Sequence, residues 1–199
     1  MEFLAQKSTP VTSSQISCSF PGLPLGASLV STAVRVNSRN KLIGIIPKLS
    51  RSYSVKFDFK PSQFQPGWTN IIHLTSTGEN CCNYGDRIPA VWVRSRSSGA
   101  TTNKLEVSSA INNNGNFFFS PRPATVPLGQ WTTVEITQLK EGNSYRYSVK
   151  VGGRRITTAI NRKAREFTNV IVFGADDWSR AAKGSMRNLV INPNVIGRV

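Results

Sequence analysis

Two stretches of the chain determine the fold: Tyr53-Ser54-Val55-Lys56-Phe57-Asp58-Phe59 and Tyr145-Arg146-Tyr147-Ser148-Val149-Lys150-Val151. Apolar and polar side chains alternate in both, which is typical of a strand with one face in a core and the other in water. Turn-forming Pro, Gly and Asn residues separate further short segments of this kind, and no long segment has the 3.6-residue period of a helix. These further strand candidates are 29–37, 41–46, 69–75, 88–94, 104–111, 116–119, 131–138, 154–159, 168–174 and 187–192.

Many short strands and almost no helix predict an all-β protein. We expect an antiparallel, two-sheet jelly-roll sandwich of roughly 11 to 13 strands. A chain of 199 residues is long enough to bury one core without disulfides or metals. Residues 1–26 are rich in Ser, Thr and Pro and are predicted to be a loose N-terminal arm, with a single domain at 27–199.

The composition is strongly basic: 25 Lys and Arg against 10 Asp and Glu give a formal net charge of +15. Such a charge bears on the choice of partner and not on the fold, and it favours sulfated glycans, nucleic acid or anionic membrane surfaces. No apolar run approaches the ~20 residues of a membrane span. The first 20 residues lack the apolar core of a secretory signal. The chain is therefore either intracellular or begins after a removed signal, and we expect a secreted, extracellular protein.

Three cysteines, Cys18, Cys81 and Cys82, are too few for a disulfide scaffold. Because their number is odd, we predict that Cys18 bonds to Cys81 or Cys82 and that one thiol remains free. A bond between the adjacent Cys81 and Cys82 is the alternative. Three free thiols would instead indicate a reducing compartment.

Several motifs in the second half resemble the concanavalin A-like lectin/glucanase superfamily, especially its laminin-G-like and pentraxin-like domains. They are Gly-Gln-Trp-Thr-Thr-Val-Glu-Ile at 129–136, the hairpin at 145–153, the strand at 167–173 and Gly-Ser-Met-Arg-Asn-Leu-Val-Ile at 184–191. Residues 67–93, with Gly-Asp-Arg-Ile-Pro-Ala-Val-Trp at 85–92, look like invertebrate extracellular modules of this type. The resemblance covers residues 28–192 and implies the fold. It does not choose among the lectins, glycosidases and protein-binding modules of the superfamily.

Catalysis is not expected. Glycosidases need two carboxylates that flank the sugar bond, and retaining enzymes of the superfamily place them at alternating positions of one strand, a pattern that this chain lacks. A Ser/His/Asp triad would have to use His73, the only histidine, which lies in a strand pattern and is expected to be structural. A glycoside hydrolase or lyase is therefore the least favoured of three function classes.

No cofactor is required by the sequence, and calcium is the one metal considered. Asp176 and Asp177 follow a strand, where loop carboxylates of pentraxin and laminin-G relatives often bind calcium. The competing interpretation is a turn in which an aspartate caps backbone amides. Trp178, next to these aspartates, is the best candidate for stacking on a sugar ring, whereas Trp92 and Trp131 fall on strands and are assigned to the core.

The strongest charge signal is a basic strip between residues 143 and 166, in which Glu166 is the only acid. Two of its cations fall on the outward face of the 145–151 strand and two more follow the Gly152-Gly153 turn. Arginine pairs bidentately with sulfate, carboxylate or phosphate, although a plain solvated face would have the same composition. The strip comprises Arg146, Lys150, Arg154, Arg155, Arg162, Lys163 and Arg165.

From these features we predict a non-catalytic, lectin-like module that binds an anionic glycan or glycosaminoglycan through the basic strip and Trp178. A structural or protein–protein interaction module of an extracellular matrix, with an extracellular protein as its partner, is the alternative. Nucleic acid is expected to bind only non-specifically, because the sequence has no helix-turn-helix, zinc finger or aromatic-basic platform.

Charge reversal tests the basic strip. Replacing Arg154 and Arg155 by Glu should weaken retention on immobilised heparin more than replacing Arg35 and Arg39, a basic pair outside the strip. An exposed ion pair contributes only about 0–1 kcal/mol, so the strip must act through several cations together. Equal elution of the two double variants would show that the chain is merely basic.

Overall fold

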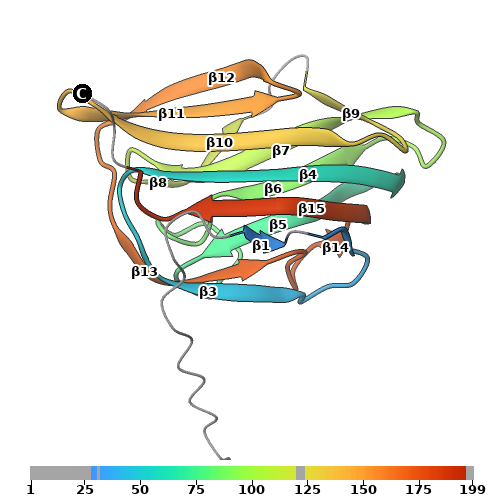
Figure 1. The fold of residues 1–199 in the computed structure, drawn as a ribbon, viewed down its shortest axis with the longest axis horizontal. Helices are drawn as coiled ribbons and strands as arrows, with labels where there is room; N and C mark the ends of the chain where they lie inside the picture. Colours follow the sequence, from blue (N-terminus) through green and yellow to red (C-terminus); the bar gives the residue numbers. More distant parts are fainter. Residues whose placement is uncertain (1–27, 31, 120–123, 196–199) are drawn as a thin grey trace, which may run out of the picture.

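The computed structural model describes residues 28–30, 32–119 and 124–195 as two facing β-sheets (Figure 1). The first sheet has seven strands, ordered β1 (Ser28–Val30), β15 (Lys183–Asn192), β4 (Tyr53–Gln63), β10 (Thr132–Glu141), β11 (Ser144–Val151) and β12 (Arg154–Asn161), with β2 (Val34–Arg35) beside β15. The second has eight strands, ordered β3 (Leu42–Leu49), β13 (Phe167–Phe173), β5 (Gly67–Thr75), β6 (Ala90–Ser95), β7 (Thr102–Ile111) and β8 (Asn114–Phe119), with β9 (Thr125–Pro127) beside β7 and β14 (Arg180–Ala181) beside β5.

The predicted all-β jelly-roll sandwich is confirmed. The strand pairs are antiparallel apart from β14 with β5. The described residues form 15 strands, more than expected, because the two- and three-residue strands β1, β2, β9 and β14 carry too short a pattern to be read from sequence. The predicted arm at 1–26 lies outside the described residues. Within them, no helix is long and apolar enough to cross a membrane.

The core lies between the two sheets and is built from the alternating stretches. Tyr53, Val55, Phe57 and Phe59 of β4 are each at most 2% exposed. Across the core, Phe119 of β8 stacks on Tyr147 of β11 with ring centroids 5.2 Å apart. Full burial of one such side chain stabilises the fold by about 1.5–3 kcal/mol.

Two tyrosine hydroxyls lie inside this core. Burial raises the pKa of Tyr53 and of Tyr147 above the usual value, so both phenols remain neutral over the ordinary pH range. They therefore act as packing groups and not as acids or bases.

The outer face of the eight-stranded sheet follows from the same alternation. Val91 and Val93 point into the core, so Trp92 and Arg94 of β6 point away from it. Their neighbours across β5 and β7 share this outward direction: Trp68 and Lys104 flank Arg94 in the register. The sheet thus presents a row of aromatic and cationic side chains on the face that does not form the core.

The loop between β5 and β6 carries the two adjacent cysteines. Cys81 and Cys82 are joined to each other by a disulfide. The structure therefore has the vicinal alternative, and the prediction that Cys18 bonds to one of them is wrong, because both sulfurs are already paired. Cys18 itself lies outside the described residues.

Gly184 on β15 lies where this strand approaches β4 closely. A Cβ added there would lie 2.5 Å from the Lys60 carbonyl oxygen and 2.8 Å from the Phe59 ring, whereas a Cβ at Gly44 would meet nothing within 4 Å. Gly184→Ala should destabilise the fold by about 1–3 kcal/mol, as overpacking does. Gly44→Ala is the matched control and should leave the melting temperature nearly unchanged. Equal melting temperatures of the two variants would contradict the close approach.

Candidate functional site

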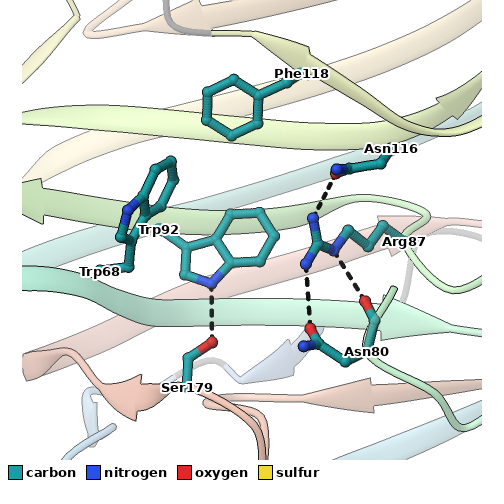
Figure 2. Close-up of a pocket in the computed structure, with 7 residues that line it drawn as sticks. All are labelled: Trp68, Asn80, Arg87, Trp92, Asn116, Phe118 and Ser179. Atoms are coloured by element: carbon teal, nitrogen blue, oxygen red, sulfur yellow. Dashed lines mark hydrogen bonds between the residues drawn. The ribbon is translucent and has the colours of Figure 1, made fainter. Parts of the chain in front are cut away.

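An open pocket of about 400 Å³ lies on the outer face of the eight-stranded sheet (Figure 2). Strands β5, β6 and β8 contribute its aromatic side chains, and the loops that follow β5 and β13 contribute polar ones. Its lining residues are Trp68, Asn80, Arg87, Trp92, Asn116, Phe118 and Ser179.

Three aromatic rings form one wall of the pocket. The ring centroid of Trp68 lies 6.2 Å from that of Trp92 and 5.3 Å from that of Phe118, both edge-on. Trp92 is only 3% exposed, whereas Trp68 is 38% and Phe118 is 40% exposed. Large exposed aromatics gathered at a hollow are a surface on which a ligand with an apolar face can pack.

Arg87 forms the opposite side of the pocket, and its guanidinium is fixed in place. Its Nε donates to the Asn80 carbonyl oxygen at 2.9 Å, its Nη2 donates to Asn80 Oδ1 at 3.2 Å, and its Nη1 donates to Asn116 Oδ1. The Arg87 Cζ also lies 4.7 Å from the centroid of the Trp92 ring, within cation–π range. Three of the five guanidinium N–H groups are thus used within the described chain, which leaves two for a ligand.

Electrostatics favour an anion beside Arg87. Burial lowers the pKa of the Arg87 guanidinium below its usual value, while the nearby Asp176 and Asp86 carboxylates act in the opposite direction. An arginine nevertheless stays protonated in proteins. The pocket therefore holds a permanent, partly desolvated positive charge, and desolvation strengthens its interaction with an incoming anion.

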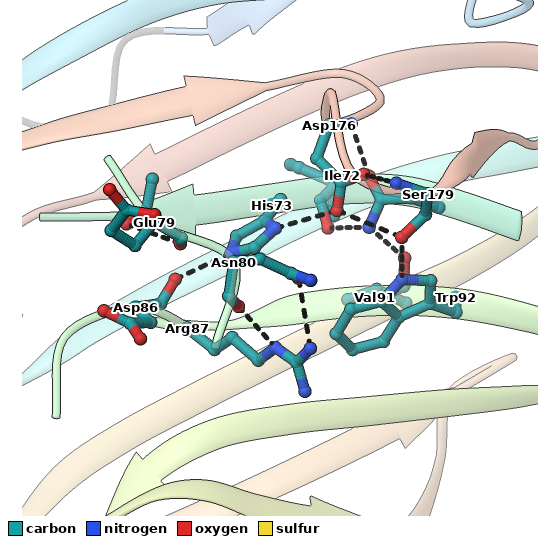
Figure 3. A network of polar contacts seen from close by, with 12 residues as sticks. Ile72, His73, Glu79, Asn80, Asp86, Arg87, Val91, Trp92, Asp176 and Ser179 are labelled. Atoms are coloured by element: carbon teal, nitrogen blue, oxygen red, sulfur yellow. Dashed lines mark hydrogen bonds and ion pairs between the residues drawn. The ribbon is translucent and has the colours of Figure 1, made fainter. Parts of the chain in front are cut away.

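A buried polar network supports the pocket from beneath (Figure 3). Trp92 Nε1 donates to Ser179 Oγ at 3.2 Å, and the Ser179 backbone N–H donates to Asp176 Oδ1 at 2.6 Å. His73 Nδ1 lies 2.9 Å from Asp176 Oδ2, and its Nε2 donates to the Asp86 carbonyl oxygen at 2.7 Å. The network thereby links the loop after β13 to the loop after β5 through His73, which lies on β5.

The network contains serine, histidine and aspartate but is not a catalytic triad. A triad needs the histidine between the serine and the aspartate. Here the Asp176 carboxylate lies between them, because the Ser179 hydroxyl at 3.4 Å and His73 Nδ1 at 2.9 Å both contact its Oδ2. His73 is fully buried, as expected for a structural histidine.

The structure separates the sequence-predicted basic strip into two groups at opposite ends of β12. Arg155 lies opposite Lys150 in the register, and Arg154 is its neighbour. Arg162, Lys163 and Arg165 come after the other end of the strand, eight residues away. Eight strand residues span roughly 26 Å, and Arg146, opposite Ile160, and Lys150, opposite Arg155, lie between the two ends, so the seven cations are spread along β11 and β12.

Two cations of the strip are already paired. Arg146 Nη2 lies 2.7 Å from Glu141 Oε2, and Lys150 Nζ lies 3.0 Å from Glu135 Oε1. Both acids come from β10, the neighbouring strand, and so fall outside the sequence window that contained Glu166 alone. Arg154 and Arg155 remain exposed on the outer face or edge of the seven-stranded sheet.

The second group of cations packs against the loop after β5. The Arg165 Cζ lies 4.4 Å from the centroid of the Tyr84 ring, and its Nη2 donates to Asn113 Oδ1 at 2.8 Å. The Tyr84 hydroxyl in turn donates to the Lys163 carbonyl oxygen at 3.0 Å. Arg162 is exposed beside them. These contacts hold two surface turns together.

The two aspartates proposed for calcium point to different surroundings. Asp176 is fully buried and accepts hydrogen bonds from its own network, whereas Asp177 is exposed. Among the described residues, no group of three or more His, Cys, Asp or Glu side chains is placed to hold a metal ion. Calcium binding at this loop stays a prediction, now with one of its two carboxylates engaged by protein donors.

Trp178 lies in a loop with its ring exposed, as the sequence predicts, whereas Trp131 differs from its expected place. The Trp178 ring is 36% exposed and lies 5.3 Å from His73 and 6.1 Å from Phe173, beside the pocket and not in its lining. Trp131, assigned to the core, is instead half-buried under Arg187, whose Cζ lies 4.1 Å from the ring centroid. A sugar-stacking role for Trp178 stays a prediction.

The sequence does not predict the residues of the aromatic pocket as one site. Trp68 falls in a loop-like context that suits an exposed, sugar-stacking aromatic, but Trp92 is assigned to the core because a tryptophan on a strand is most often buried, and Arg87 stands only within a motif. The spacing of four residues could have indicated the site. Trp92 and Arg94 alternate with Val91 and Val93, so the two pairs face opposite sides of the strand. An aromatic and a cation on the non-core face of a strand point to a surface function.

Comparisons with known proteins agree with the fold. No family model matches this chain, and no curated protein matches it. The native heptameric SAP-like pentraxin from Limulus polyphemus is similar in structure, with a TM-score of 0.55 and 16% identity over 83% of this chain and 76% of that chain. The Ruminococcus gnavus IT-sialidase CBM40 bound to α2,3-sialyllactose has a TM-score of 0.47 and 13% identity over 87% and 92%. The pentraxin comparison thus shows the jelly-roll sandwich fold that the sequence resemblance implied.

The buried network gives a test of the site's framework. Asp176→Asn should remove the carboxylate that contacts His73 and the Ser179 backbone N–H and destabilise the fold by about 1–3 kcal/mol, because buried hydrogen-bonding groups lose their partner. Asp177→Asn is the matched control, since its carboxylate is exposed next to the same position. Chemical denaturation measures both. A loss of less than about 1 kcal/mol for Asp176→Asn would show that the network does not hold the loops.

Proposed function

We propose that this chain is a non-catalytic, extracellular carbohydrate-binding module that takes an anionic, carboxylated or sulfated glycan in the pocket formed by Trp68, Trp92, Phe118 and Arg87. The observation that carries the proposal is a fixed guanidinium facing an exposed aromatic wall across one open pocket. The wall suits the sugar ring, and the guanidinium suits the acidic group.

The aromatic wall matches the chemistry of a pyranose. One face of the sugar ring carries mainly C–H groups, which pack on flat aromatic side chains, while the hydroxyls need polar partners. Trp68 and Phe118 offer exposed rings. Asn80, Asn116 and Ser179 provide amide and hydroxyl groups around them. Clefts of this kind, apolar with a few fixed polar groups, are the usual form of small-ligand sites.

Arg87 supplies selectivity for an acid. A planar guanidinium binds carboxylate or sulfate oxygens through parallel N–H donors. Two of its N–H groups remain after the bonds to Asn80 and Asn116, and those bonds already hold the side chain in place. A pre-organised side chain loses less conformational entropy when the ligand binds.

The pocket's composition supports binding without catalysis. Its lining has no carboxylate, histidine or tyrosine, the groups that act as general acids and bases on glycans. The Asp176 carboxylate lies below the pocket and is engaged by His73 and Ser179. An extracellular location is supported by the Cys81–Cys82 disulfide, because disulfides persist mainly in oxidising compartments.

The basic strip is the second candidate surface for the same ligand class. Arg154 and Arg155 are its exposed cations on the opposite sheet, close to a shallow hollow that also contains Glu135 and Glu141. These two acids oppose an anion there. The aromatic pocket has no acid in its lining, and the Asp176 and Asp86 carboxylates near Arg87 are buried and engaged by protein groups, so it is the favoured site.

The experiment is a glycan array that carries neutral, carboxylated and sulfated glycans, probed with the wild type, Trp68→Ala and Trp131→Ala. We expect acidic glycans to bind and Trp68→Ala to weaken binding at least about tenfold, because a tryptophan in a binding pocket is often an energetic hot spot. Trp131→Ala removes an equally large ring from the other sheet and should bind like the wild type.

Arg87→Lys separates charge from geometry in the same assay. It keeps the positive charge but loses the planar pair of donors, so it should reduce the preference for acidic over neutral glycans. The absence of binding to any glycan, or equal losses for the two tryptophan variants, would contradict the proposed function.

A further inference from the structure

A second hollow, of about 610 Å³, adjoins the aromatic pocket on the same face. It lies where β6 ends and β7 begins, and β9 forms its far side. Three of its lining residues, Arg94, Arg96 and Lys104, are exposed cations. We call this hollow the basic pocket.

The two pockets share a boundary. The Arg94 guanidinium lies over the Trp68 ring, with its Cζ 5.2 Å from the centroid. Trp68, Arg94 and Lys104 are direct neighbours across β5, β6 and β7. Along β6, Trp92 and Arg94 lie two residues apart, a step of roughly 6.8 Å, and Arg96 follows directly after the strand ends at Ser95. The cations therefore continue the row that begins with Trp92.

The charge balance of the basic pocket is positive. Glu106 is the acid nearest to it: its Oε1 lies 3.9 Å from Arg94 Nη1, and its side chain is 1% exposed. Neither Arg96 nor Lys104 has a carboxylate within ion-pair distance in the described chain. Two cations at the mouth of the pocket are thus available to an anion.

Asn103 also lies at the wall of the basic pocket, but not on the face that carries the cations. The residue is 9% exposed, and its Nδ2 has no hydrogen-bond acceptor in the described part of the chain. On β7 it shares the core face with Leu105, whereas Lys104 points to the outer face. The basic pocket is therefore defined by its exposed cations and by the contact of Arg94 with Trp68.

We infer that the basic pocket is a second subsite of the same binding surface, which binds a sulfate or carboxylate group on another residue of an acidic oligosaccharide whose first residue occupies the aromatic pocket. This inference rests on the proposed function and adds to it the length and charge pattern of the ligand. The chain would bind a polyanionic oligosaccharide of several residues more tightly than a disaccharide, with Arg94 in contact with both parts.

Heparin oligosaccharides of two and six sugar residues, titrated by calorimetry at two salt concentrations, test the inference. The double variant Arg96→Gln/Lys104→Gln should lose about tenfold in affinity for the hexasaccharide and become less salt-sensitive, while its affinity for the disaccharide stays that of the wild type. Both side chains are exposed, so circular dichroism should show the wild-type fold. Arg35→Gln/Arg39→Gln is the matched control, with two exposed cations outside both the basic pocket and the basic strip.

The outcomes separate the two levels of the argument. If Arg96→Gln/Lys104→Gln binds the hexasaccharide like the wild type while Trp68→Ala binds it weakly, the second subsite is refuted and the aromatic pocket stands. If Trp68→Ala has no effect on either oligosaccharide, the proposed function fails as well. A larger loss for Arg35→Gln/Arg39→Gln, or no binding of the hexasaccharide by the wild type, would also overturn the inference.

Discussion

His73 is the point at which the two loops around the candidate site are joined. Its ring bridges the Asp176 carboxylate and the Asp86 carbonyl oxygen, and all three residues are fully buried. A carbonyl oxygen only accepts hydrogen bonds, so Nε2 must carry a proton, and the contact with Asp176 then closes the link from the opposite nitrogen. Arg87 follows Asp86 directly, and Ser179 is bonded to Asp176. The position of the guanidinium relative to the Trp92 ring therefore depends on this buried bridge.

The same bridge explains why the outer face of β5 is polar and yet buried. Asn70 and His73 lie on the non-core side of the strand, in register with Trp92 and Ala90, and the loops cover both. Asn70 adds a hydrogen bond from its Oδ1 to the Asp176 backbone N–H at 2.9 Å. Polar groups that are buried with satisfied hydrogen bonds fix one arrangement of the loops, whereas an apolar patch would permit several. Rigidity of the loops is what a pocket with a pre-oriented arginine requires.

The sequence predicts the sandwich well and the site poorly, for a physical reason. Alternation within β4 and β11 is local, so a window of seven residues is enough to recognise a strand and its core face. The aromatic pocket joins β5, β6, β8 and two loops, and only the sheet order brings Trp68, Phe118 and Arg87 together. Charge counting fails in the same way: the acids that pair with Arg146 and Lys150 come from the neighbouring strand and do not appear in the local window.

Net charge and binding site are therefore separate properties of this molecule. A formal charge of +15 creates a field that attracts any polyanion from a distance, and that field acts mainly on the rate of encounter. Discrimination among anions needs donors held in fixed directions near a surface that the ligand can fit. Exposed cations whose direction no neighbour fixes, such as Arg154, contribute to this electrostatic field and not to discrimination among anions. Arg87 adds fixed direction to charge, because its neighbours hold the guanidinium against the Trp92 ring and use three of its five N–H donors.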